Sequence, residues 1–162
     1  MNSYTEEYEI KKQYIVNSLN DNLLNKKWNC LGDSITANDR AGVVPYCYHI
    51  GNKHNMIINN YGISGSTLSN ISNPMSERYV DMDNNADIIT VFGGTNDSNV
   101  PIGTINDTDN TTIYGALNVL LKGLIEKYPD KKIGYISPIQ RRNNNETLKN
   151  IVEAIKIACA KY

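Results

Sequence analysis

Cysteine and histidine are both scarce in this chain of 162 residues, which has three cysteines and two histidines. Cys30, Cys47 and Cys159 show no Cys-x-x-Cys spacing and leave an odd count. This pattern argues against a disulfide framework and against a structural zinc site. We therefore expect three buried free thiols, which is the common state of unpaired cysteines.

The sequence also lacks an excess of charge of one sign and any long hydrophobic run. The formal net charge is −1, so no basic field favours nucleic acid or an anionic membrane as a partner. No apolar run approaches the length of a membrane span, and the first residues are acidic, unlike a signal peptide. We expect no nucleic-acid or membrane partner and synthesis in the cytoplasm; the final location stays open.

What the sequence does contain is an alternation of strand-like and helix-like segments. Apolar runs predict strands over 28–31, 56–61, 87–92 and 132–137. Helical spacing predicts helices over 43–50, 76–82, 111–128 and 145–162, and another over 3–24. Such alternation is typical of an α/β domain with a parallel sheet between two helical layers. We expect an N-terminal helical extension over 1–26 and one domain over 27–162.

Small and polar residues follow the first three predicted strands. In open α/β sheets, sites lie beyond the carboxyl ends of the strands. The residues there are Gly32-Asp33-Ser34, Gly62-Ile63-Ser64 and Gly93-Gly94-Thr95-Asn96-Asp97. A serine in such a place can act as a nucleophile if a base accepts its proton. Gly62 N–H and the Asn96 amide could join Ser34 N–H in an oxyanion hole.

These segments resemble three sequence blocks of one enzyme family. Gly32-Asp33-Ser34-Ile35-Thr36 is similar to the first block of the SGNH (GDSL-type) hydrolases. Asn60-Tyr61-Gly62-Ile63-Ser64-Gly65 and Gly93-Gly94-Thr95-Asn96-Asp97 resemble the second and third blocks. The resemblance implies a flavodoxin-like three-layer fold, with Ser34 as nucleophile and Gly62 and Asn96 as oxyanion donors. It implies no metal and no organic cofactor, and a short acyl ester as substrate, such as an O-acetylated carbohydrate.

The fourth block of the family, an Asp-x-x-His that supplies the acid and the base, has no counterpart in the sequence. His49 and His54 lie in and just after the predicted helix 43–50, which leads away from Ser34. We therefore expect the last strand and C-terminal helix of the family to be missing, and activity to be impaired. The fourth strand would then be an exposed edge through which copies of the chain could self-associate.

Other interpretations remain open from the sequence. Asp33 could be a second catalytic carboxylate, but we expect it to stabilise a turn. Arg78 could reach an anionic ligand, but we expect a solvated or ion-paired helix residue. The chain could be a non-catalytic carbohydrate-binding or structural module that retains the fold. It could also bind phosphate or a nucleotide with Gly32–Ser34 as an anion nest, although no Walker-type or Gly-x-Gly-x-x-Gly spacing is present.

Overall fold

A parallel sheet of four strands forms the centre of the computed structural model, which describes residues 22–140 and 145–162. The strands are ordered β2-β1-β3-β4, and their bounds are Lys27–Gly32 (β1), Ile57–Gly62 (β2), Ile88–Phe92 (β3) and Lys132–Ile136 (β4). Gly32 is in register with Gly62 on one side and with Phe92 on the other. The carboxyl ends of β1, β2 and β3 therefore meet at one edge, and the predicted α/β fold with a parallel sheet is confirmed.

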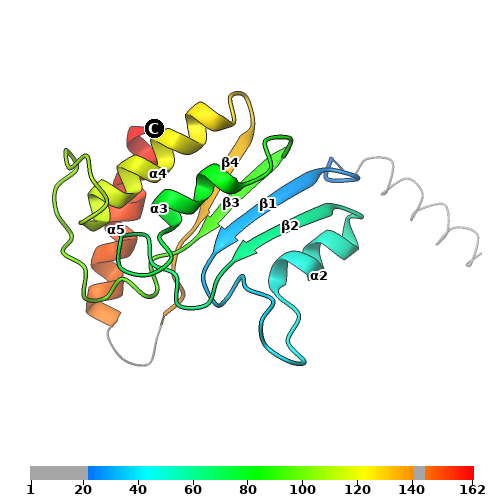
Figure 1. Cartoon of the computed structure of the whole chain (residues 1–162), viewed down its shortest axis with the longest axis horizontal. Coiled ribbons are helices and arrows are strands. Elements are labelled where there is room, and N and C mark those ends of the chain that lie inside the picture. The colour runs from blue at the N-terminus through cyan, green and yellow to red at the C-terminus, as the bar shows by residue number, and fades with distance from the viewer. Residues whose placement is uncertain (1–21, 141–144) are drawn as a thin grey trace, which may run out of the picture.

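Helices cover both faces of this sheet (Figure 1). Their bounds are Tyr46–Lys53 (α2), Met75–Arg78 (α3), the 3-10 turn Tyr79–Asp81 (η1), Ile113–Lys127 (α4) and Asn145–Lys161 (α5). The helix that the sequence predicts over 3–24 falls outside the described residues, except for 22–24, which lie in a turn. The part of the chain that is described includes no helix long and apolar enough to cross a membrane.

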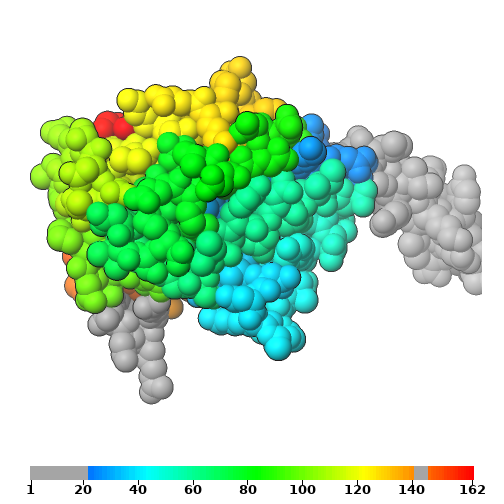
Figure 2. All heavy atoms as spheres, in the orientation of Figure 1, coloured from blue at the N-terminus to red at the C-terminus, as the bar shows by residue number. Residues whose placement is uncertain are grey.

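The start of α2 differs from the prediction by three residues. The sequence predicts a helix from Val43, whereas α2 begins after Pro45, which caps it with an extended ψ of 151°. A residue that precedes proline is disfavoured in the helical region, so Val44 cannot continue a helix into Pro45. Residues 38–44 instead form an exposed loop, which projects from the body of the molecule (light blue in Figure 2).

Alternate residues of the strands face different helical layers. Leu31 and Ile89 belong to the large buried cluster that α4 and α5 complete. Trp28 and Cys30 belong to a smaller cluster with Cys47 of α2. Two of the three thiols are buried as expected, but Cys159 is exposed, because α5 turns the neighbouring small residues Ala154 and Ala158 toward the core.

The outer edge of β4 is uncovered in the described part of the chain. β4 pairs with β3 alone, and both Lys132 and Gly134 are exposed. An unpaired strand edge presents free backbone donors and acceptors. Self-association through this edge stays a prediction.

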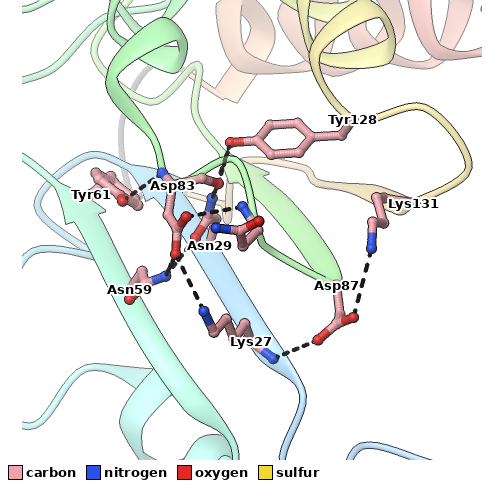
Figure 3. A network of polar contacts seen from close by, with 9 residues as sticks. Lys27, Asn29, Asn59, Tyr61, Asp83, Asp87, Tyr128 and Lys131 are labelled. Carbon is pink, nitrogen blue, oxygen red and sulfur yellow. Dashed lines mark hydrogen bonds and ion pairs between the residues drawn. The ribbon is translucent and has the colours of Figure 1, made fainter.

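A polar network links the strands near the amino end of the sheet (Figure 3). The side chain of Asn29 is fully buried in β1 and donates to the Asp83 carbonyl at 2.8 Å and to Tyr128 Oη at 3.1 Å. Asn59 of β2 donates to Asn29 Oδ1 at 2.9 Å. The network ties the loop before β3 to β1, β2 and the end of α4.

Candidate active site

Ser34 lies in a single helical turn that begins directly after β1. The Asp33 carbonyl accepts from Thr36 N at 3.0 Å and from Ala37 N at 2.9 Å. The Asp33 carboxylate accepts from Ile35 N at 2.9 Å, so Asp33 stabilises the turn, one of the roles considered from the sequence. Ser34 is half-buried, and among the described residues its N–H has no acceptor. The start of such a turn suits an anion.

Gly62 lies beside this turn, but its N–H already has a hydrogen-bond acceptor. It donates to Asn60 Oδ1 at 2.8 Å, while Asn60 Nδ2 donates to the Thr36 carbonyl at 2.7 Å. A Cβ on Gly62 would come within 2.3 Å of Ala37 N, so the glycine allows β2 and the Ser34 turn to touch. These contacts give Gly62 a packing role and weigh against the predicted use of its N–H as an oxyanion donor.

Gly65 offers the N–H that Gly62 does not. It has a positive φ of 79° in a turn that Ser66 N closes by donating to the Ile63 carbonyl at 3.2 Å. Its surroundings are open, and no acceptor in the described ranges takes its N–H. The sequence contained a signal for this turn, since glycine is preferred at a turn position that requires positive φ.

Asn96 reaches the same loop from the end of β3. Asn96 is half-buried, and its side-chain nitrogen donates to the Ser66 carbonyl at 2.8 Å. An amide nitrogen carries two hydrogens, and within the described structure the second has no acceptor. The structure therefore joins the Asn96 loop to the Gly65 turn, and the Ser34 turn is joined to β2 through Asn60.

Asp97 holds the loop that follows the Gly65 turn. Its buried carboxylate accepts from Leu68 N at 3.0 Å and from Ser69 N at 3.2 Å. Burial raises the pKa of Asp97, and the nearby Asp33 charge adds to the effect, while these hydrogen bonds oppose it. Sequence reasoning assigned no role to Asp97, because the partners come from a loop 28–29 residues away in the chain.

Neither histidine is placed to serve Ser34. Both belong to the connection from β1 to β2: His49 is exposed on α2, and His54 follows its last residue at the amino end of the sheet. This agrees with the expectation that both would lie away from Ser34. In the described part of the chain, Ser34 Oγ has no hydrogen-bond partner, and no group of three His, Cys, Asp or Glu side chains could hold a metal ion.

Comparisons with known proteins assign this architecture to a family. The four-stranded parallel sheet with its helices matches the α/β fold of solved SGNH hydrolases. The family model of the GDSL-like lipase/acylhydrolases matches residues 30–162, and the chain belongs to this family. No curated protein matches the chain.

Three solved structures illustrate the likeness. A protein of Lactobacillus plantarum is 34% identical with a TM-score of 0.79, over 86% of this chain and 74% of that one. A protein of Bacteroides uniformis, described as a GDSL-like lipase, is 24% identical with a TM-score of 0.68, over 85% and 80%. Axe2, an acetylxylan esterase from Geobacillus stearothermophilus, is 18% identical with a TM-score of 0.61, over 85% and 73%.

Proposed function

We propose that this chain carries the acyl-transfer site of an SGNH-type ester hydrolase, with Ser34 as the nucleophile. The observation that supports the proposal most is the arrangement at one sheet edge of the Ser34 turn, the Gly65 N–H and the second hydrogen of the Asn96 amide, for which the described residues offer no acceptor. In this proposal Gly65 replaces Gly62 as the backbone donor of the oxyanion hole.

The proposed chemistry is a transfer of an acyl group to the serine and then to water. Ser34 Oγ attacks the ester carbonyl carbon, and the carbonyl oxygen becomes an oxyanion that Ser34 N–H, Gly65 N–H and Asn96 Nδ2 stabilise. The alcohol leaves with a proton, and water then releases the acid from the acyl-serine. The substrate we propose is a short acyl ester, such as an acetyl group on a carbohydrate.

The turnover is proposed to be weak in this chain. A serine hydroxyl needs a base, and neither His49 nor His54 lies at the site. Without a complete triad, oxyanion stabilisation and binding alone give about 10³–10⁴-fold catalysis over water. The same observation favours a second candidate, a module that binds acetylated carbohydrate without turning it over.

The test is hydrolysis of p-nitrophenyl acetate by the 162-residue chain, compared with Ser34→Ala. Ser137→Ala is the matched control, because Ser137 is an exposed serine just after β4. We expect slow release of nitrophenol that Ser34→Ala abolishes and Ser137→Ala retains. Equal rates in all three proteins would refute Ser34 as nucleophile; binding of an acetylated xylo-oligosaccharide without Ser34-dependent release would favour the binding module.

A further inference from the structure

Arg78, the last residue of α3, places its guanidinium between the segments that carry the proposed site. Nη1 donates to the Tyr61 carbonyl at 3.0 Å, and Nη2 donates to the Gly32 carbonyl at 3.3 Å and to Ser66 Oγ at 2.7 Å. Nε donates to the Asn73 carbonyl at 3.0 Å. One side chain thus contacts the carboxyl ends of β1 and β2 and both ends of the loop 66–73.

This guanidinium is unusual because no carboxylate accompanies it in the described structure. Its hydrogen-bond acceptors are three carbonyls and one hydroxyl, and burial lowers the pKa of Arg78. Taking a charge out of water is unfavourable unless the charge is paired or well hydrogen-bonded. Arg78 is half-buried and hydrogen-bonded within the protein, so the solvated and ion-paired interpretations do not describe it, and its position calls for another explanation.

The contacts connect Arg78 to each part of the proposed oxyanion site. Gly32 precedes the Asp33–Ser34 turn by one residue. Ser66 follows Gly65, and the Ser66 carbonyl is the acceptor of Asn96 Nδ2. The carboxyl end of β2 is held next to Gly32 as well, since Ile63 N donates to the Gly32 carbonyl at 3.0 Å. A shift of the guanidinium would therefore change the spacing of the serine turn and both neighbouring donors.

We propose that Arg78 is a positioning residue, whose planar fork sets the distance between the Ser34 turn and the Gly65–Ser66 turn. The proposal rests on the proposed function of Ser34. This role requires the planar guanidinium group and not only its charge, because two nitrogens of fixed geometry donate to two carbonyls and a hydroxyl. Lysine would keep the positive charge but lacks the planar, two-pronged donor group that contacts these three oxygens.

The test compares Arg78→Gln and Arg78→Lys with wild type in the 162-residue chain. Arg40→Gln is the matched control, because Arg40 is an exposed arginine in the loop that follows the Ser34 turn. Misplacement of reacting groups by about 1 Å can cost 10²-fold in rate. We expect Ser34-dependent kcat on p-nitrophenyl acetate to fall about 10- to 100-fold in Arg78→Gln and by less in Arg78→Lys, with KM within about twofold.

Backbone hydrogen exchange gives a readout that does not need turnover. In Arg78→Gln we expect faster exchange in peptides covering 32–37 and 61–69, with wild-type exchange in α4 and β3. Unchanged exchange in 61–69, or wild-type kcat in both Arg78 variants, would overturn the proposal. If Arg78→Gln does not fold, Arg78→Lys carries the same comparison. A wild type that lacks Ser34-dependent hydrolysis would refute the proposed function, and exchange would still decide whether Arg78 fixes the two turns.

Discussion

Gly62→Ala is the sharpest probe of how closely β2 approaches the serine turn. The new Cβ would lie 2.3 Å from Ala37 N, 2.5 Å from Thr36 C and 2.7 Å from Ala37 Cα. All three are backbone atoms, so no flexible side chain can move aside. The turn or the strand must shift as a whole, and overpacking of this kind costs about 1–3 kcal/mol. For a chain of this size that corresponds to a fall in Tm of about 2–12 °C.

Gly134→Ala is the matched control for this measurement. Gly134 is also a strand glycine, but a Cβ there would meet only Thr90 Cγ2 at 3.8 Å, an ordinary contact. Both substitutions restrict the unfolded chain equally, an effect worth about 0.4–1 kcal/mol in favour of alanine. The difference between the two variants therefore isolates the clash in the folded protein.

Thermal unfolding followed by circular dichroism gives both values. We expect Gly134→Ala to melt at or slightly above the wild-type temperature and Gly62→Ala to melt well below it. Two variants with the same Tm would show that β2 and the Ser34 turn do not touch, and the packing role given to Gly62 would be wrong.

Two further predictions concern the third strand and its loop. Asn96→Ala should lower Ser34-dependent kcat by about 10²-fold or more, because it removes a proposed oxyanion donor, while the lost bond to Ser66 costs about 1 kcal/mol in denaturant unfolding; full kcat would contradict the assignment. Asp97 has a raised pKa when folded, so its contribution to stability is present below the unfolded value of about 3.9 and is lost as pH rises toward the folded pKa. The advantage of wild type over Asp97→Asn in free energy of unfolding should therefore shrink from pH 4 upward, and an advantage that grows with pH would contradict the raised pKa.

The strands and helices could be predicted from the sequence because their signals are local. The apolar run before Gly93 predicted β3 to within one residue, and the helical spacing predicted α4, which Thr112 caps by accepting from Gly115 N. The prediction of which α5 residues are buried was less accurate: Ala154 and Ala158 are buried, whereas Cys159 is exposed. Alanines carry a weak hydrophobic signal, yet both belong to the buried core cluster.

The site was harder to predict because its contacts join distant segments. The serine and Asn96 could be named from their places after strands. The hydrogen bond from Gly62 N to Asn60 Oδ1 depends on side-chain geometry, which the spacing of residues in the sequence does not reveal. The role of Arg78 depends on carbonyls 46 and 17 residues earlier in the chain, so only the folded structure shows it.

The buried amide of Asn29 has a consequence for how the sheet finds its register during folding. Neighbouring residues of a strand point to opposite faces, so a slip of β1 by one residue would turn Asn29 toward the layer of Trp28, Cys30 and Cys47. There the amide would lose its bonds to Asp83, Tyr128 and Asn59, and an unsatisfied buried amide costs about 1–3 kcal/mol for each lost partner group. An apolar residue at position 29 would tolerate either alignment. The asparagine therefore discriminates against misaligned pairing of the central strand, and correct alignment of that strand is what brings the three loops together at the opposite end.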